Sequence, residues 1–150
     1  MSVIGTVRGG RLDVADDRRD AVEAVVELDP DVVEADATLG LDGFSHLEVV
    51  YVFDRVDEGA VCRGLRRPRG RPDWPQVGIL AQRAKDRPNR IGVATCLLLG
   101  VDGLRLSVRG LDAVDGTPVL DVKPYMTGFA PRQAVRAPDW ATELMDHYWQ

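Results

Sequence analysis

The sequence predicts a mainly β protein: an antiparallel β-barrel with a C-terminal α-helix laid against it. Short runs rich in β-branched and apolar residues follow one another closely along the chain, as the strands of a small barrel do. Two of these runs are followed by Asp-Gly, a dipeptide that favours tight hairpin turns. Only the last residues show the four-residue apolar spacing of a helix. We therefore expect a barrel domain over residues 1–135 and, over residues 136–150, a helix packed on the same domain.

The first half of the chain contains three strand candidates. They are the segments VIGTV, AVEAVVELDP and FSHLEVVYVFD, which cover residues 3–7, 21–30 and 44–54. A short helix around residues 15–25 is a weaker alternative for the start of the second segment. The next segment, residues 58–75, is rich in Gly, Pro and Arg and is expected to be a loop.

The second half contains four strand candidates at close spacing. They are VGILAQ, IGVATCLLLGVDG, LRLSVRGLDAVDG and TPVLDVKPY, and we expect hairpin turns at Asp102-Gly103 and Asp115-Gly116. Strands joined in this way indicate an antiparallel sheet that closes or nearly closes. In the tail, Trp140, Leu144 and Tyr148 recur every four residues, so a helix there would carry them on one face.

Composition excludes several classes of protein. With 150 residues, 45% hydrophobic and 29% charged, the chain is typical of one soluble globular domain. It has neither the apolar segment of a signal peptide nor a run of membrane-spanning length, so we expect a cytoplasmic protein. The net charge of −5 argues against general coating of nucleic acid. Two separated cysteines and two histidines, Cys62, Cys96, His46 and His147, make a disulfide or a metal site improbable.

Three polar segments are candidates for a functional site. Residues 82–92 gather three arginines and a lysine around Pro88, which gives the loop a defined shape. Asp54 and Arg55 follow the long third strand candidate, where β proteins often place ligand contacts. His46, at the entry to that strand, is either a structural histidine or a base.

The third segment is residues 110–125. In a strand, residues two apart share a face, so Asp121, Lys123 and Tyr125 would point together. A carboxylate, an ammonium and a phenol on one side form either a reactive polar site or a salt bridge beside a packing tyrosine. The spacing leaves both interpretations open.

Three segments of the chain are similar, in order, to the motifs of a known family. LDGFSHLEVVYVFD, GILAQRAKDRPNRIGV and GLDAVDGTPVLDVKPY resemble GFSH…VFH, FATRSPHRPNPIG and DGTPVLDIKPY of the TsaA-like, or TrmO-like, S-adenosylmethionine-dependent methyltransferases. The resemblance implies a β-barrel unrelated to the Rossmann type, usually dimeric, with the cofactor near the subunit interface. It also implies methylation of N6-threonylcarbamoyladenosine in tRNA, here by a short form without the extra C-terminal domain of the longer enzymes.

The resemblance further implies roles for individual residues. It implies that S-adenosylmethionine contacts Asp54, Arg55, Arg83, Arg87, Asn89, Val93, Asp112, Val114, Asp115, Gly116 and Thr117. Asp121 or Tyr125 is the expected catalytic base, with Lys123 orienting it. A cationic run in the loop is expected to meet tRNA phosphates through Arg63, Arg66, Arg67, Arg69 and Arg71.

Departures from the family pattern keep two other functions open. The SPH of the family is Ala84, Lys85 and Asp86 here, and the proline after RPN is Arg90. The family's N-terminal PRQ has only a loose counterpart, at residues 17–19. The alternatives are a methyltransferase of the same fold with a small-molecule acceptor and a non-catalytic S-adenosylmethionine-binding module.

Overall fold

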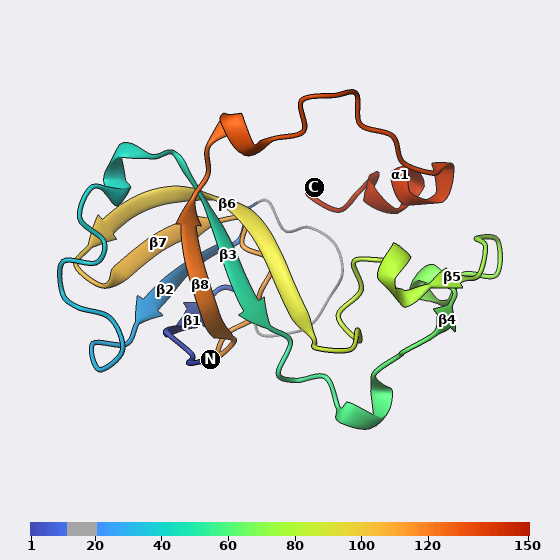
Figure 1. Ribbon diagram of the computed structural model, residues 1–150, viewed down its shortest axis with the longest axis horizontal. Helices are drawn as coiled ribbons and strands as arrows, with labels where there is room; N and C mark the ends of the chain where they lie inside the picture. Colours follow the sequence, from blue (N-terminus) through green and yellow to red (C-terminus); the bar gives the residue numbers. More distant parts are fainter. Residues whose placement is uncertain (12–20) are drawn as a thin grey trace.

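A computed structural model of the protein describes residues 1–11 and 21–150. Within these residues a closed antiparallel barrel has the strand order β1-β2-β7-β6-β3-β8 (Figure 1). The barrel strands are β1 Gly5–Gly9, β2 Glu23–Leu28, β3 His46–Val52, β6 Ile91–Asp102, β7 Arg105–Arg109 and β8 Pro118–Pro124. The mainly β fold and the antiparallel barrel predicted from the sequence are confirmed. Of the weaker helix considered around residues 15–25, residues 15–20 lie outside the described part, and residues 23–25 belong to β2.

Strand alternation separates the core from an outer face. In β3, Leu47, Val49 and Tyr51 are buried while the residues between them are only partly covered. The first half of β6 alternates in the same way, with Ala94 and Cys96 inside. Because successive side chains point to opposite sides of a sheet, the intervening residues of β3 and β6 form one continuous outer face.

A β-bulge changes the phase of β8. Val50 pairs with Asp121, but Tyr51 pairs with Val119, so one strand has an extra residue at this point. As a result, Val119 and Val122 both contact the core although they are three residues apart. Asp121 and Lys123 are left on the outer face.

The two Asp-Gly turns have different outcomes. Asp102 ends β6, and Gly103, with a φ of 57°, turns the chain into β7 as predicted. The predicted hairpin at Asp115-Gly116 is wrong, because β7 pairs with β2 and β6 whereas β8 pairs with β1 and β3. Residues 110–117 instead run between strands that are not neighbours, and Leu111 and Ala113 are buried in the barrel core.

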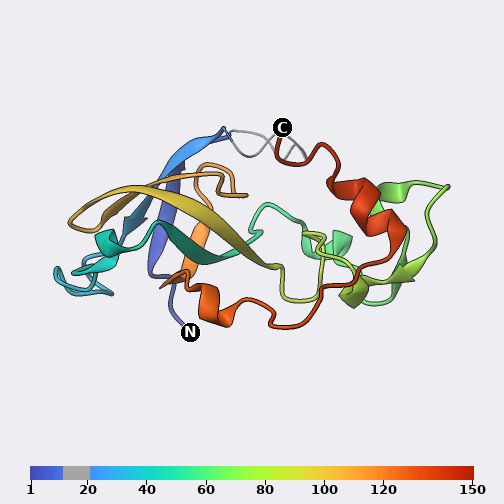
Figure 2. The same ribbon diagram turned by 90° about the horizontal axis from the view of Figure 1, so that it is seen from above.

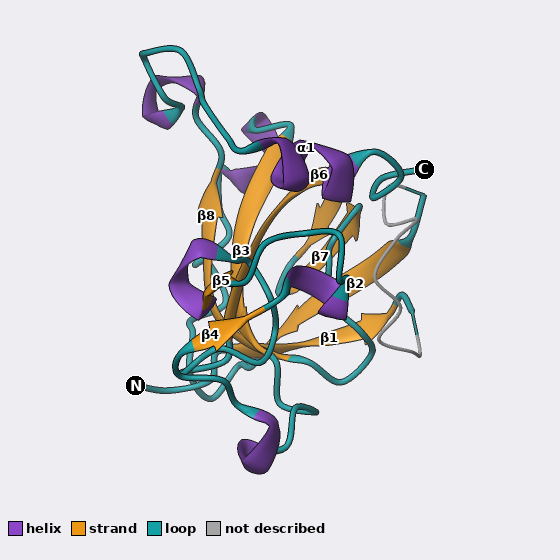
Figure 3. Ribbon diagram, turned by 90° about the vertical axis from the view of Figure 1, so that its right-hand side faces the viewer, coloured by secondary structure: helices purple, strands orange, loops and turns teal. Residues whose placement is uncertain are grey.

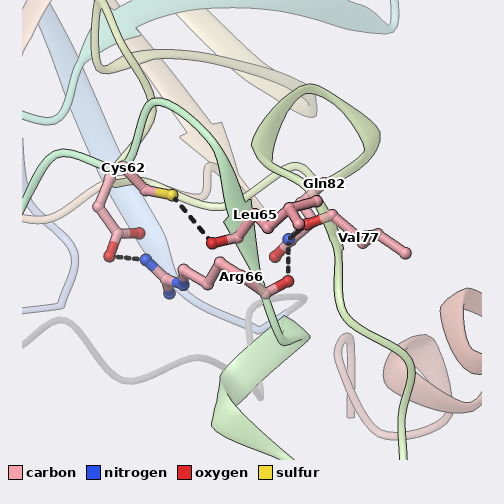
Figure 4. Close-up of polar contacts among 6 residues, drawn as sticks. Cys62, Leu65, Arg66, Val77 and Gln82 are labelled. Carbon is pink, nitrogen blue, oxygen red and sulfur yellow. Dashed lines mark hydrogen bonds and ion pairs between the residues drawn. The ribbon is translucent and has the colours of Figure 1, made fainter.

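A second, smaller substructure lies beside the barrel. Residues 57–90, here called the β4–β5 lobe, contain the short strands β4 Leu65–Arg66 and β5 Val77–Gly78 (Figures 1 and 2). The prediction that VGILAQ is a strand of the barrel is therefore wrong. The segment before it, predicted to be a loop, contains β4. The side-chain amide of Gln82 donates to the carbonyls of Arg66, at 2.9 Å, and Val77, at 3.3 Å, which ties the two strands together (Figure 4).

The predicted tail helix forms, but it is short. The helix α1 Asp139–Met145 packs over the β4–β5 lobe (Figure 3). Trp74 of the lobe donates its indole N–H to Glu143 at 2.9 Å, and its ring lies 6.4 Å from that of Trp140. Tyr148 lies beyond the helix end. The remaining helices are 3-10 turns at Leu41–Gly43, Glu58–Ala60, Pro68–Gly70, Ile79–Ala81 and Thr127–Phe129. Within the described ranges, no helix has the length and apolar character needed to cross a membrane.

Candidate functional site

Antiparallel pairing brings the candidate segments to one end of the barrel. Val52 pairs with Ile91, and Tyr51 pairs with Val119, so the end of β3 lies beside the starts of β6 and β8. The loops attached there are residues 53–56, 83–90 and 110–117. Together with the first residues of β6, up to Val93, they are called the rim site.

Two arginines connect the three loops of the rim site. Arg55 donates a guanidinium hydrogen bond to the carbonyl of Asp115 at 2.7 Å. Arg90 donates to the carbonyl of Val56 at 2.7 Å. The segment after β3 therefore has a loop bound to it on each side. One is residues 83–90, called the cationic turn, and the other is Asp115-Gly116, called the Asp-Gly bend.

The arginines of the cationic turn bind main-chain carbonyls. Arg87 donates to Gln82 at 2.6 Å, and Arg83 donates to Val93 at 3.0 Å. These bonds give the turn a fixed shape, as expected from Pro88. Arg83 is also an exposed residue.

Arg90 has an unusual backbone conformation. Its φ is 54°, in the left-handed region that non-glycine residues rarely adopt. Proline holds φ near −65°, so the proline found at this position in the family motif would not fit this backbone. The change to Arg90 is therefore also a change in the shape of the turn.

The Asp-Gly bend is fixed to the first strand. The carboxylate of Asp115 accepts a hydrogen bond from the Gly9 amide at 2.9 Å, and the Gly116 amide donates to Val7 at 2.7 Å. Gly116 has a φ of 87°, which favours glycine. Thr117 is buried beside it, as is Val114 on the other side of the bend.

Asp112 is held by two tyrosines that sequence reasoning did not select. Tyr51 donates its hydroxyl to the Asp112 carbonyl, and Tyr148 donates its hydroxyl to the Asp112 carboxylate. Tyr51 was interpreted as a strand residue and Tyr148 as one of a helix face. The signal that could have found Tyr51 is that a buried tyrosine hydroxyl usually needs a polar partner.

Of the three polar residues in and just after β8, Asp121 and Lys123 contact each other, whereas Tyr125 contacts another residue. Lys123 forms an ion pair with Asp121, with 2.6 Å between Nζ and Oδ2, and this hydrogen bond raises the pKa of Lys123. Tyr125 packs edge-on against His46, with 6.4 Å between the ring centroids. The salt-bridge interpretation of Asp121 and Lys123 thus agrees with the geometry.

The remaining candidates lie on exposed positions. Val93 points outward from β6 with 44% of its surface exposed. Asp54 and Asn89 are exposed in the rim site. The loose counterpart of the family's PRQ, residues 17–19, lies outside the described residues.

Three arginines of the cationic run make contacts within the lobe. Arg66 pairs with Asp86, and Arg67 donates to the carbonyl of Trp74 at 2.6 Å. Arg71 pairs with Asp73, which raises the pKa of Arg71, and its guanidinium lies 4.0 Å from the centroid of the Trp74 ring. The other two arginines of the cationic run, Arg63 and Arg69, have exposed side chains.

The cysteines and acidic groups of the described residues are dispersed. In residues 1–11 and 21–150, no three His, Cys, Asp or Glu side chains are grouped so that they could hold a metal ion. Cys96 is buried in the core, and burial raises the pKa of its thiol to about 12. It is therefore a neutral packing residue.

The side chains of the rim site fit a nucleoside that carries an amino acid. Guanidinium groups of Arg55 and Arg83 can bind a carboxylate. The carboxylates of Asp54 and Asp112 can bind an ammonium or ribose hydroxyls. The exposed Val93 offers an apolar surface to a flat ring. This combination of anion, cation and apolar contacts matches the parts of S-adenosylmethionine.

The closed barrel, with polar loops gathered at one end, defines a class of small antiparallel β-barrel domains. A model of the tRNA-methyltransferase O N-terminal domain matches residues 15–130. The chain belongs to this family.

Relatives and solved structures agree with this assignment. The tRNA (adenine(37)-N6)-methyltransferase of Escherichia coli K12 is 41% identical over 97 residues, which are 62% of this chain and 41% of the relative. A probable S-adenosyl-L-methionine-binding protein of Methanothermobacter thermautotrophicus is 38% identical over 74% of this chain and 75% of its own. The crystal structure of TrmO from Pseudomonas aeruginosa superposes with a TM-score of 0.70 at 31% identity, over 89% of this chain and 59% of that one. The chain thus spans less than half the length of the Escherichia coli relative.

Proposed function

We propose that this protein binds S-adenosylmethionine in the rim site and methylates a modified adenosine, N6-threonylcarbamoyladenosine, in tRNA. The observation that carries the proposal is the joining of the three motif segments, through Arg55 to Asp115 and Arg90 to Val56, each at 2.7 Å. The names of the Escherichia coli and Homo sapiens relatives, both tRNA (adenine(37)-N6)-methyltransferases, support the acceptor.

The residues of the rim site have distinct tasks in this proposal. Arg83 and Arg55 bind the carboxylate of the cofactor, while Asp112 and Asp54 bind its ammonium or ribose hydroxyls. Val93 packs against the adenine. The other residues of the implied set are proposed to complete the contacts with the cofactor: Arg87, Asn89, Val114, Asp115, Gly116 and Thr117.

Charge decides where the arginines act. Bound S-adenosylmethionine supplies a methyl group on a positively charged sulfonium. A guanidinium beside that sulfur would repel it, so the arginines bind the distant carboxylate or shape the backbone. The main catalytic task of the chain is to orient the two reactants and exclude water.

N6 of this nucleoside bears the carbamoyl group and one hydrogen, and this hydrogen must be lost as a proton when the methyl group is added. We assign this proton to Asp121 or Tyr125 as the base, with Lys123 orienting the base. The 2.6 Å ion pair between Asp121 and Lys123 supports a fixed position for both groups.

Binding partners follow from the exposed surfaces. Arg63, Arg66, Arg67, Arg69 and Arg71 form the proposed contact with tRNA phosphates. A homodimer is also proposed, in line with the family resemblance. The proposed location is the cytoplasm, and residues 136–150 are proposed to act with the barrel as one domain.

Two measurements test the proposal. Calorimetry with S-adenosylmethionine is expected to show binding, and labelled S-adenosylmethionine is expected to transfer its methyl group to tRNA. Asp121→Asn and Tyr125→Phe are the test variants. Loss of a general base typically lowers the rate by about 100-fold or more, so at least one variant should lose transfer while it still binds the cofactor. Full turnover in both variants would remove these residues from the mechanism.

A non-catalytic binding module is the second candidate. It is favoured by the Methanothermobacter thermautotrophicus relative, which is named only for S-adenosyl-L-methionine binding and is covered over 75% of its length. Cofactor binding without methylated product from tRNA or from a metabolite extract would support this function. A product in the metabolite extract alone would indicate a small-molecule acceptor.

A further inference from the structure

A cavity on the outer face of the barrel is not explained by the cofactor site. It has a volume of about 330 Å³, which is sufficient for a nucleobase with a substituent. Its lining includes His46 of β3, Thr95 and Leu97 of β6, Arg109 of β7 and Trp149 of the C-terminal tail. His46 pairs with Leu97, and Leu97 pairs with Arg109, so these three side chains form one row across three strands.

The cavity lies close to the rim site in the sequence of β6 and of the loop after β7. Thr95 and Val93 both point outward from β6, and side chains two residues apart on a strand are separated by about 7 Å. On the other side, Gly110 of the cavity lies two residues before Asp112 of the rim site. A ligand in this cavity would therefore be next to a cofactor that contacts Val93 and Asp112.

The C-terminal tail is fastened at the boundary between the two sites. Tyr148 donates its hydroxyl to the Asp112 carboxylate. The ring of Trp149 lies edge-on to that of Tyr148, with 4.9 Å between the centroids. Because Tyr148 is bound to Asp112 of the rim site, the next residue, Trp149, borders the cavity. Trp149 remains 40% exposed.

The lining is chemically suited to a flat base that carries an anion. The indole of Trp149 offers a stacking surface. His46 is held in place by the Ser45 hydroxyl, at 2.7 Å from its Nδ1. Arg109 is oriented by Glu23 through a 2.7 Å bond from one of its nitrogens, while 43% of its side chain stays exposed.

We infer that this cavity binds the methyl-accepting base, stacked on Trp149, with a carboxylate borne by the base directed to Arg109. The inference rests on the proposed methyl transfer and specifies where its acceptor is bound. It also gives the C-terminal tail a role in recognising the acceptor.

Binding of free nucleosides tests the inference without measuring turnover. Calorimetry would compare adenosine with N6-threonylcarbamoyladenosine, each in the presence of saturating S-adenosylhomocysteine. Trp149→Ala should weaken both nucleosides by about tenfold or more, because a stacking surface is lost. The control is Phe129→Ala, which removes an aromatic ring that is 86% exposed elsewhere, and it should leave both affinities unchanged.

The charge of Arg109 has its own matched control. Arg109→Gln should weaken only the nucleoside that bears a carboxylate. Arg105→Gln removes the same charge from the same strand, together with an equivalent ion pair to Glu27, and should have no effect. Thermal melting of all four variants would check that they remain folded.

The outcomes separate the inference from the proposed function. Unchanged nucleoside affinity in Trp149→Ala would overturn the inference, even if the wild-type protein methylates tRNA. Competition between the nucleoside and S-adenosylhomocysteine would also overturn it, because the cofactor would then occupy this cavity. If the wild-type protein does not bind S-adenosylhomocysteine but shows nucleoside binding that depends on Trp149, only the proposed function would fail.

Discussion

The position of Tyr51 depends on the absence of a side chain at Gly92. A Cβ on Gly92 would lie 2.6 Å from the Tyr51 ring and 2.9 Å from the ring of Phe53. Tyr51 is 1% exposed and donates its hydroxyl to the carbonyl of Asp112. One glycine in β6 therefore helps to set the position of the loop that carries Asp112.

Substitution of this glycine tests the dependence. Gly92→Ala should lower the free energy of unfolding by about 1–3 kcal/mol, because the core must shift to accept the methyl group. Cofactor affinity should also fall as Asp112 moves. Gly100→Ala is the control on the same strand, since no atom lies within 4 Å of its added Cβ. Denaturant unfolding that gives equal stabilities for the two variants would contradict this account of Tyr51.

Single residues also show the limits of sequence reasoning. The contact between Asp121 and Lys123 could be predicted from their spacing, because residues two apart in a strand share a face. The bulge between Val119 and Asp121 depends on the pairing of β8 with β3, and the sequence of β8 alone does not show that pairing. The positive φ of Arg90 was equally hidden, because arginine is not a residue that favours it.

At the scale of elements, dipeptide signals predicted turns but not strand partners. Gly103 and Gly116 both have the positive φ that an Asp-Gly turn favours. Only the first turn joins neighbouring strands, because the chain after β7 runs to β8, which lies on the far side of β3. The apolar run that contains β5 likewise predicted a strand but not its partner. Its apolar residues pack within the β4–β5 lobe and not in the barrel.

The arginines of the cationic run combine contacts within the β4–β5 lobe with exposure on its surface. Arg66, Arg67 and Arg71 are engaged with Asp86, Trp74 and Asp73. Arg63 and Arg69 are exposed, as are Arg67 and Arg71, so four arginines of the cationic run can reach a phosphate. The lobe is thus expected to contact tRNA mainly through these exposed arginines.

The salt dependence of tRNA binding tests whether the lobe contacts the phosphates. The double substitution Arg63→Gln with Arg69→Gln should weaken tRNA binding and flatten the plot of log K against log salt by about one to two units of slope. A control that removes the same charge from the barrel is Arg8→Gln with Arg105→Gln, which should leave the slope nearly unchanged. Equal slopes for the two double variants would show that the lobe is not the electrostatic contact.

For the whole molecule, topology explains why distant segments share a site. The antiparallel pairing of β3 with β6 and β8 places the end of one strand beside the starts of two others. The family motifs predicted which segments belong together, and the register supplies the physical reason. No sequence motif predicted that the C-terminal tail returns to Asp112, because this contact depends on a single tyrosine, Tyr148, beyond the end of α1.

The central claim is that the cationic turn and the Asp-Gly bend form one cofactor site. Titration of ¹⁵N-labelled protein with S-adenosylhomocysteine, followed through the backbone amide resonances, tests this directly. The account predicts that amides of residues 54–56, 83–93 and 112–117 shift together, with one common dissociation constant. Shifts confined to one of these loops, or shifts centred on residues outside them, would contradict it.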